Sequence, residues 1–354
     1  MSAQSKSSIN FAIVGCGRIA QRHAKHIGRV GDLVAVCDVV EERASDLAAA
    51  HDATPYTELE DMLRQARDVD VVSICTPNGL HAEHTIRAVQ AGYHVLCEKP
   101  MALSVADCGR MITEAEKANK RLFVVKQNRF NPPVAAMKEV VEQGRLGDLY
   151  SVQLNCFWNR HQQYYRDSDW RGSADLDGGV LFTQFSHFID LMYWVVGDVV
   201  EAQAVTDNFK HEETTDFVDT GVVTLKFRNG AIGGVHFTTN AHGGNMEGSI
   251  TLFGEKGTLK VGGEYLNELE YQDIAGHTIT GLQESTGAND YGTYKGSMSN
   301  HDKVYENLVD VFRGDEQAAA VGYEGLKTVE IIEKIHGAVE AVAPGGSSAL
   351  RAVR

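Results

Sequence analysis

The first third of the chain alternates short, continuous apolar runs with longer amphipathic stretches. Runs without polar interruption are typical of parallel strands that are covered on both faces. They predict strands at residues 10–14, 33–38, 54–56, 69–75, 94–97 and 122–125. Apolar residues at helical spacing between them predict helices at 18–28, 41–50, 58–65, 81–90 and 105–118. This alternation indicates a doubly wound α/β sheet.

The pattern changes near residue 149, where polar and apolar residues begin to alternate one by one. A period of two is typical of antiparallel strands with one wet face. We expect strands at 150–157, 201–205, 217–227, 231–238, 248–253 and 257–261, and helices at 180–196, 302–312 and 323–342. Asn229-Gly230 between two of these strands is a strong hairpin signal. The prediction is therefore an α/β domain over residues 1–127 and an α+β domain with a mostly antiparallel open sheet over 128–354.

Composition narrows the class of protein. With 354 residues the chain is long enough for two cores, and 33 Lys and Arg against 48 Asp and Glu give a net charge of −15. This charge argues against nucleic-acid binding. The sequence shows neither an apolar run of the ~18 residues that span a bilayer nor a signal peptide, so we expect a cytoplasmic protein that does not enter membranes.

The cysteines point to a reducing environment. Cys37, Cys75 and Cys97 fall inside predicted strands, so we interpret the six cysteines as reduced core thiols. The spacing of Cys and His residues predicts no metal site.

A cofactor site is predicted where the first strand meets the first helix. The sequence Gly15-Cys16-Gly17-Arg18-Ile19-Ala20 lets a tight turn approach a pyrophosphate, which then rests on the helix N-terminus. Asp38 follows the second strand, where a carboxylate accepts hydrogen bonds from ribose hydroxyls and repels a 2′-phosphate. The pattern therefore favours a Rossmann dinucleotide-binding domain that takes NAD in preference to NADP.

Two further strand ends carry polar residues. The fourth strand runs into Thr76-Pro77-Asn78, with His81 opening the next helix, and the fifth runs into Glu98-Lys99-Pro100. Parallel sheets bind ligands outside the carboxyl ends of their strands. A lysine amine in a dry cleft there can exchange a proton near neutral pH, so Lys99 is the first candidate for catalysis.

Three motifs, in this order and spacing, are similar to the glucose-fructose oxidoreductase, inositol dehydrogenase and MocA (Gfo/Idh/MocA) family: Gly15-x-Gly17-x-x-Ala20, Thr76-Pro77-Asn78-x-x-His81 and Glu98-Lys99-Pro100. The second half adds Trp170-Arg171-Gly172, Gly178-Gly179 and His187-x-x-Asp190, so the resemblance covers nearly the whole chain. It implies an NAD-linked oxidoreductase.

The resemblance also implies roles for single residues. Lys99 would lie beside nicotinamide and substrate, and His187 would take a hydroxyl proton while a hydride leaves the same carbon, although Lys99 could equally be the base. The family usually carries Asp at the position of Thr183, which shares a predicted helix face with His187, so the usual Asp-His pair cannot form. The implied cofactor-binding residues are Gly15, Gly17, Arg18, Ile19, Asp38, Thr76, Asn78, His81, Glu98, Lys99, Gln127, Trp170 and Arg171.

Residues 126–133, 157–160 and 181–190 resemble, more narrowly, the bacterial UDP-N-acetylglucosaminuronate 3-dehydrogenases of the WlbA type. Such enzymes oxidise the 3-hydroxyl of a UDP-linked N-acetylated glucuronic acid to the 3-keto sugar in the biosynthesis of surface polysaccharide. Arg160 or Arg166 could pair with the uronate carboxylate. The implied substrate-binding residues are Lys99, Asn128, Asn159, Arg160, Tyr164, Arg166, Thr183, Gln184, His187, Ser299 and His301.

Other interpretations stay open. The chain could be a dehydrogenase of another sugar or polyol, an NAD-dependent glycosidase of the same fold, or a silent NAD-binding sensor, which Lys99 and His187 argue against. NADH could leave after each turnover or be reoxidised in place by a 2-oxo acid. By analogy with relatives we expect a homodimer or homotetramer that pairs through the second sheet. Five apolar residues could form that face or the internal core: Val222, Leu225, Ile232, Val235 and Phe237.

Overall fold

The chain forms two compact units in a computed structural model that describes residues 8–284, 287–290, 292 and 294–342. The first unit contains the described residues up to Gln127, together with 175–177 and 299–329. The second contains the described parts of 128–174, 178–298 and 330 onward. Two segments from the later part of the chain thus return to the first unit.

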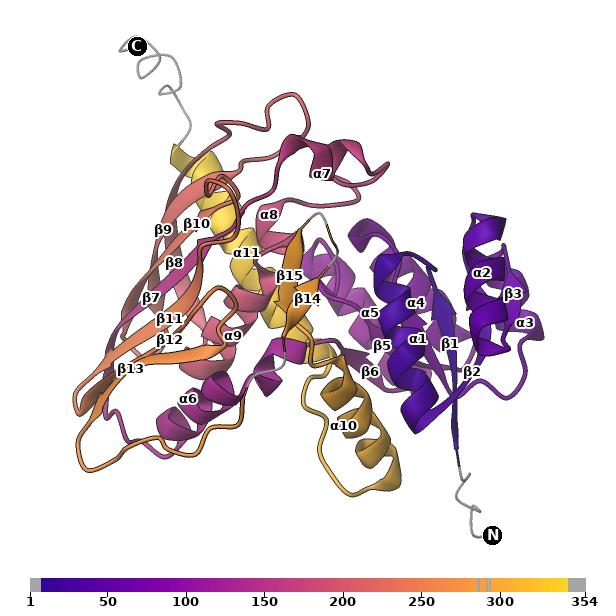
Figure 1. Cartoon of the computed structure of the whole chain (residues 1–354), viewed down its shortest axis with the longest axis horizontal. Helices are drawn as coiled ribbons and strands as arrows, with labels where there is room; N and C mark the ends of the chain where they lie inside the picture. Colours follow the sequence, from indigo (N-terminus) through magenta and orange to yellow (C-terminus); the bar gives the residue numbers. More distant parts are fainter. Residues whose placement is uncertain (1–7, 285–286, 291, 293, 343–354) are drawn as a thin grey trace. The chain divides into compact units, whose positions relative to one another are not determined.

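The first unit is built on a six-stranded parallel sheet (Figure 1). Its strands are β1 (Ile9–Val14), β2 (Gly31–Cys37), β3 (Thr54–Tyr56), β4 (Val71–Ile74), β5 (His94–Cys97) and β6 (Leu122–Val124). The strand order is β3-β2-β1-β4-β5-β6, so the predicted doubly wound sheet is confirmed. The direction of winding reverses between β1 and β4, which is where such sheets bind ligands.

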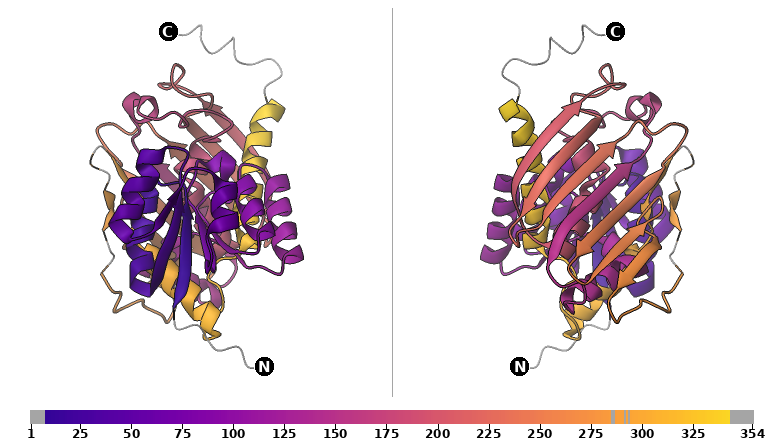
Figure 2. Two further views of the ribbon diagram at one scale, coloured as in Figure 1. Left: turned by 90° about the vertical axis from the view of Figure 1, so that its right-hand side faces the viewer. Right: turned by 90° about the vertical axis from the view of Figure 1, so that its left-hand side faces the viewer.

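Helices flank this sheet on both sides, as the left view of Figure 2 shows. They are α1 (Arg18–Val30), α2 (Glu41–His51), α3 (Leu59–Gln65), the short η1 (Asn78–Leu80), α4 (His81–Gln90) and α5 (Val105–Lys117). From the later chain, α10 (His301–Arg313) packs on α1, and α11 (Gly322–Val342) follows it. Tyr305 of α10 reaches the sheet, with its ring edge-on to Phe11 at 5.5 Å. None of the helices in the described ranges is long and apolar enough to cross a membrane.

The second unit is built on a mixed, mostly antiparallel sheet of seven strands. They are β7 (Leu149–Phe157), β8 (Val199–Asp207), β9 (Thr220–Phe227), β10 (Ile232–Thr238), β11 (Glu247–Gly254), β12 (Gly257–Gly262) and β13 (Glu268–Ile274). In the order β13-β12-β11-β7-β10-β9-β8, the pair β7 and β10 is parallel and the other pairs are antiparallel. The predicted α+β architecture is confirmed, and Asn229-Gly230 joins β9 to β10 as the hairpin signal indicated.

Several elements of the second unit were not predicted. They are η2 (Gln127–Phe130), which starts at the end of the first unit, α6 (Pro132–Glu142), α7 (Gln162–Arg166), β13, and the two-stranded sheet of β14 (Ala288–Asp290) and β15 (Lys295–Met298). Helix α6 begins with two prolines, which fit the first turn of a helix but hide its start in the sequence. Strand β13 lies at the sheet edge and carries charged residues, so its apolar pattern is weak.

The prediction of one continuous helix over 180–196 is wrong. The segment forms α8 (Val180–Thr183) and α9 (Ser186–Val196), and the chain leaves the helical path at Phe185, where φ is −108 and ψ is 1. The Phe185 ring packs on Trp158 and Phe188, at 5.7 and 6.0 Å between ring centroids. Burial of this ring outweighs the helical preference of the local sequence.

One face of the second sheet is open. In the right view of Figure 2 its strands lie in front of the helices of the same unit. Val222 and Ile232 point to this face, since they are 51% and 60% exposed, whereas Leu225, Val235 and Phe237 are buried in the core. The structure therefore divides the five apolar candidates between the two faces.

One buried and two half-buried histidines make the stability of the first unit depend on pH. Burial lowers the pKa of His26, His84 and His94 to about 4 in each case. Between about pH 6.5 and pH 4 the unfolded chain therefore binds more protons than the folded chain. We expect the free energy of unfolding to fall as the pH is lowered through this window, which denaturant titrations at several pH values measure. Replacement of the three histidines by glutamine should flatten this dependence, and an unchanged slope would contradict the assignment.

Candidate active site

Three strands of the first sheet end at the same level. Val14 of β1 pairs with Ile74 of β4, and Ile74 pairs with Cys97 of β5. The segments that begin at Gly15, Cys75 and Glu98 therefore leave the sheet side by side. The sequence predicted this convergence, because the carboxyl ends of parallel strands share one edge.

The glycine-rich turn after β1 has the shape that a dinucleotide needs. Gly15 has a φ of +89, and a Cβ there would lie 2.8 Å from the backbone of Cys75 and Thr76. A Cβ on Gly17 would meet nothing within 4 Å, so its backbone faces open space at the start of α1. Arg18, which is exposed, and Ile19, which is half-buried, occupy the first turn of that helix. The turn thus fits a pyrophosphate at the helix N-terminus.

Asp38 holds this turn from the end of β2. Its Oδ2 accepts the N–H of Cys16 at 2.7 Å, and its Oδ1 accepts the N–H of Val40 at 2.9 Å. A carboxylate at this strand end accepts hydrogen bonds from ribose hydroxyls and repels a 2′-phosphate, so Asp38 suits NAD. Burial raises the pKa of the neighbouring Cys16 thiol to about 12 and that of Cys37 to about 11, so neither is a nucleophile at neutral pH. All six cysteines are free and buried, which confirms the predicted core thiols.

The loop after β4 uses its polar groups to hold other backbone segments. Asn78 donates through Nδ2 to the carbonyl of Asp177 at 2.9 Å, and Thr76 Oγ1 lies 3.1 Å from Nδ1 of His84. His81 is 1% exposed, with Nδ1 at 2.6 Å from the carbonyl oxygen of Pro100 and Nε2 at 2.9 Å from that of Thr76. In the structure, the Asn78 amide and the His81 ring therefore contact protein carbonyls.

Glu98, the residue before Lys99, lies in a buried polar network. Its Oε1 accepts a hydrogen bond from His23 Nε2 at 2.8 Å, and its Oε2 accepts the N–H of Lys99 at 3.0 Å. On the far side of His23, Nδ1 contacts the hydroxyl of Tyr305 at 2.7 Å. Burial alone would raise the pKa of Glu98, but His23 and His301 outweigh it and hold the pKa well below its usual range. Lys99 itself is half-buried, and the Lys99–Pro100 bond is cis.

Three other predicted site residues lie in the first unit. His301 is 1% exposed, with Nε2 at 3.4 Å from Glu98 Oε1, so it joins the Glu98 network. Ser299 accepts a hydrogen bond from Arg22 at 2.6 Å. The carbonyl of Gln127 accepts from Asn300 Nδ2 at 3.3 Å.

In the second unit, the predicted base lies at the start of α9. His187 is 5% exposed, and its Nε2 lies 3.3 Å from Ser297 Oγ. Thr183 ends α8, so the helix break separates the two residues that one continuous helix would place on one face. Gln184 lies in the break and donates to the hydroxyl of Tyr164 at 3.1 Å.

Two arginines and several aromatic rings form a cluster in the second unit. The guanidinium carbon of Arg160 lies 5.1 to 5.3 Å from the ring centroids of Trp158 and Tyr164. The guanidinium carbon of Arg171 lies 4.3 Å from the Tyr164 centroid and 5.4 Å from that of Trp170. We call Arg160, Tyr164, Arg171 and Tyr294 the arginine-tyrosine cluster, because Tyr294 contacts both guanidinium groups. Such stacking holds flat cations in a fixed orientation.

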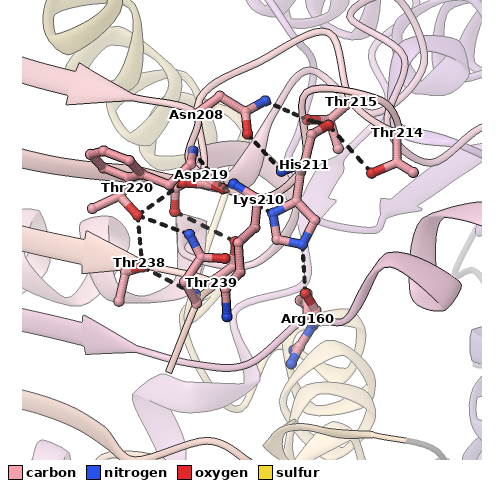
Figure 3. Close-up of polar contacts among 12 residues, drawn as sticks. Arg160, Asn208, Lys210, His211, Thr214, Thr215, Asp219, Thr220, Thr238 and Thr239 are labelled. Carbon is pink, nitrogen blue, oxygen red and sulfur yellow. Dashed lines mark hydrogen bonds and ion pairs between the residues drawn. The ribbon is translucent and has the colours of Figure 1, made fainter. Parts of the chain in front are cut away.

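A buried histidine that contacts a buried aspartate fixes the backbone of Arg160 (Figure 3). His211 contacts Asp219 Oδ2 through Nδ1 at 3.0 Å and the carbonyl of Arg160 through Nε2 at 2.7 Å. Each contact is a hydrogen bond when the ring nitrogen that faces the acceptor carries a proton. Burial alone would raise the pKa of Asp219, but His211 and the N–H groups of Lys210 and Phe209 hold it well below its usual range.

The other predicted substrate residues, Asn128, Asn159 and Arg166, differ in burial and in hydrogen-bond partners. Asn128 is buried in η2, next to Arg129, which forms a buried two-bond ion pair with Asp190 at 2.8 and 2.9 Å. Asn159 donates to the carbonyl of Ala241 at 2.5 Å. Arg166 has a half-exposed side chain, with a guanidinium nitrogen 3.7 Å from Glu213.

Sequence reasoning missed the buried residues that hold the predicted site residues in place, such as His23, Tyr305, His211 and Asp219. His23 lies 282 residues from its partner Tyr305, so no local spacing links them. A weak signal exists for His23, since Ala20, Ala24 and Ile27 mark the same face of α1 as buried.

Together, a glycine-rich turn, an acidic strand end and a lysine at the same edge of the sheet are typical of an NAD-binding oxidoreductase, here with an additional α+β unit. Residues 9–126 match the family model "Oxidoreductase family, NAD-binding Rossmann fold", and residues 134–260 match "GFO/IDH/MocA C-terminal domain". The chain belongs to the Gfo/Idh/MocA family of NAD-dependent oxidoreductases.

The solved structures and curated proteins that the chain is similar to are also dehydrogenases. The WlbA dehydrogenase from Bordetella pertussis in complex with NADH and UDP-GlcNAcA is 37% identical with a TM-score of 0.85, over 94% of this chain and 97% of that chain. The WlbA dehydrogenase from Chromobacterium violaceum, also with NADH and UDP-GlcNAcA, is 34% identical with a TM-score of 0.85, over 96% of each chain. The myo-inositol 2-dehydrogenase of Thermotoga maritima is 29% identical over 261 residues, which are 71% of this chain and 74% of that protein. The chain is therefore an NAD-dependent sugar dehydrogenase.

The two glycines of the turn should respond differently to the same substitution. Gly15→Ala forces a side chain into a left-handed conformation against backbone, so we expect a loss of ~1–3 kcal/mol in the free energy of unfolding. Gly17→Ala should fold normally and bind NADH at least ~10-fold more weakly, because its methyl group enters the path of the pyrophosphate. Thermal unfolding and NADH fluorescence titrations measure the two effects. Normal NADH affinity in Gly17→Ala would contradict the placement of the cofactor.

Proposed function

We propose that this enzyme oxidises the 3-hydroxyl of a UDP-linked N-acetylated glucuronic acid to the 3-keto sugar, in the biosynthesis of a bacterial surface polysaccharide. The observation that carries the proposal is the arginine-tyrosine cluster. Arg160 is 4% exposed, and its guanidinium donates to the carbonyls of Asn159 and Lys295 and to Asn245 Oδ1. Within the part of the chain that the structure describes, these acceptors are neutral, so the buried positive charge of Arg160 suits an anionic ligand.

The similarity to the two WlbA structures supports the same substrate, because both hold UDP-GlcNAcA. That molecule carries a carboxylate and a diphosphate, both of which bind arginine in two-bond geometry. Tyr164 and Tyr294 offer ring faces and hydroxyls beside the two guanidinium groups. We assign the anionic part of the substrate to Arg160 and, in place of the cofactor-binding role that the family resemblance implies, to Arg171, because its guanidinium lies beside Tyr164 and Tyr294. We assign Asn128, Asn159 and Gln184 to the hydroxyl and acetamido groups of the substrate.

The chemical step needs a base for the 3-hydroxyl proton and an acceptor for the hydride on the same carbon. Bound NAD supplies the hydride acceptor. We assign Lys99 and His187 to the substrate oxygen, where one takes the proton and the other donates a hydrogen bond. Lys99→Ala and His187→Asn test each role, since full turnover in either variant removes that residue from the mechanism.

The substrate assignment is tested by following NADH formation with several candidate compounds. We expect turnover with UDP-GlcNAcA, little with UDP-GlcNAc, which lacks the carboxylate, and none with free inositol or glucose. Turnover with free polyols alone would instead favour a polyol dehydrogenase. Release of hydrolysed sugar without net NADH would favour an NAD-dependent glycosidase.

Arg160 should contribute to the binding of the anionic substrate. Arg160→Gln keeps a polar side chain but removes the charge, so we expect KM for UDP-GlcNAcA to rise about 10- to 100-fold while NADH affinity stays unchanged. Arg166→Gln is the matched comparison, because its half-exposed side chain already faces Glu213. An equal rise in KM in both variants would contradict the assignment to Arg160.

We also propose that the open face of the second sheet pairs with a second copy of the chain, in a dimer or tetramer. Val205, Val222, Ile232 and Tyr271 are 75%, 51%, 60% and 52% exposed on strands β8, β9, β10 and β13. Exposed apolar residues across one sheet are typical of a protein interface. We expect light scattering to give an oligomer for the wild type and a monomer for the Val222→Lys, Ile232→Lys double variant. Val39→Lys, at an 88% exposed position of the first unit, should leave the oligomer intact.

A further inference from the structure

The turn Glu98-Lys99-Pro100 is held from both sides by histidines. It follows β5, and the N–H of Glu98 continues the sheet by donating to the carbonyl of Ile74 at 3.0 Å. Beyond that bond the turn leaves the sheet, so other groups must fix its conformation. Glu98 and Pro100 are buried on either side of the half-buried Lys99.

His81 holds the turn on the Pro100 side. It is the first residue of α4, and its ring spans from the carbonyl of Thr76 to the carbonyl of Pro100. Both acceptors are backbone carbonyls, so each contact is a hydrogen bond when the nitrogen that faces it carries a proton. The nitrogen that acts on the lysine turn is Nδ1, at 2.6 Å from Pro100.

His23 holds the turn on the Glu98 side. Its Nε2 donates to Glu98 Oε1, and the other oxygen of that carboxylate accepts the N–H of Lys99. The carboxylate therefore connects the His23 ring to the backbone of Lys99. Here the nitrogen that acts on the turn is Nε2, while Nδ1 faces Tyr305, which contacts Ser73 Oγ at 3.0 Å.

We propose that His23 and His81 are positioning residues for Lys99, each through one particular ring nitrogen. Neither residue needs to touch substrate for this role. The proposal rests on the assignment of Lys99 to the chemical step, and it adds which groups set the place of its amine. A backbone that shifts by ~1 Å can cost a catalytic group about 100-fold in rate.

Substitution by asparagine or glutamine distinguishes the role of one ring nitrogen of each histidine from that of the other. The amide nitrogen of asparagine takes the place of histidine Nδ1, and that of glutamine takes the place of Nε2. His81→Asn should therefore keep the bond to Pro100, and His81→Gln should lose it. At His23 the order reverses, because His23→Gln keeps the bond to Glu98 and His23→Asn loses it.

We expect a crossed pattern of turnover. His81→Gln and His23→Asn should lower kcat about 10- to 100-fold, with KM and NADH affinity within about threefold of the wild type. His81→Asn and His23→Gln should retain most of kcat. A purely structural role, in which any loss of the buried ring matters, would give equal losses for both amides at each position.

A second measurement reads the position of Lys99 without turnover. Trace acetylation of the folded protein, quantified by mass spectrometry, should show that the Lys99 labelling rate changes at least about threefold in His81→Gln and His23→Asn. It should stay near the wild-type rate in the other two variants. If Lys99→Met keeps full turnover, the proposed role of Lys99 fails, whereas the labelling rates still test the positioning.

The chain provides matched controls on the same two helices. His26 lies one turn after His23 in α1, and His84 lies one turn after His81 in α4, where it contacts Thr76 Oγ1. His26→Gln and His84→Gln should leave kcat and Lys99 labelling unchanged. Equal losses in these controls would overturn the proposal, as would full turnover in His81→Gln and His23→Asn.

Metal analysis of the purified enzyme tests the alternative that His23, Glu98 and His301 bind a metal ion. Ligand atoms of His23, Glu98 and His301 lie within 4.8 Å of one another, a set that could hold a divalent cation. The 2.8 Å between His23 and Glu98 is a hydrogen-bond distance, so we expect no stoichiometric metal. One equivalent of bound zinc would overturn the hydrogen-bonded positioning of Glu98.

Discussion

The buried carboxylate of Glu98 constrains the reactive edge of the first unit. A group only 6% exposed stays ionised only where protein donors replace water. His23 of α1 supplies one donor, and the N–H of Lys99 supplies another. Tyr305 of α10 orients the His23 ring in turn. Helix α1, the backbone of Lys99 and helix α10 are thus all linked to the one buried charge of Glu98.

The second unit also contains a buried carboxylate that a histidine and backbone N–H groups satisfy. Asp219 is buried and keeps its charge through backbone donors and His211. The opposite nitrogen of His211 binds the carbonyl of Arg160, as Nδ1 of His81 binds the carbonyl of Pro100. In both units a histidine fixes a carbonyl at or next to a cationic residue that we assign to substrate. A rigid ring with two opposed nitrogens suits this purpose, because it joins backbone segments without adding torsional freedom.

The sequence could predict features that depend on residues close together in the chain, but not those that depend on contacts between distant residues. The six strands of the first unit are continuous apolar runs, so local pattern revealed them, and chain topology then placed Gly15, Thr76 and Lys99 at one edge. The histidine partners of Glu98 are 75 or more residues away in the sequence, and no spacing rule connects them to it. The break between α8 and α9 was missed for the same reason, since it depends on packing of Phe185 against Trp158, which follows β7 and is distant in the sequence.

The departure at Thr183 bears on which group takes the proton. An aspartate beside a catalytic histidine stabilises the imidazolium that forms when the histidine acts as base. Thr183 offers a neutral hydroxyl where the family usually carries a carboxylate, and Ser297 Oγ, at 3.3 Å from His187 Nε2, is a neutral group as well. Neutral partners stabilise a new positive charge less than a carboxylate does. Lys99 differs, since its backbone N–H is bonded to a carboxylate that remains ionised. Within the proposed function, we therefore propose Lys99 as the base and His187 as the hydrogen-bonding partner of the substrate oxygen.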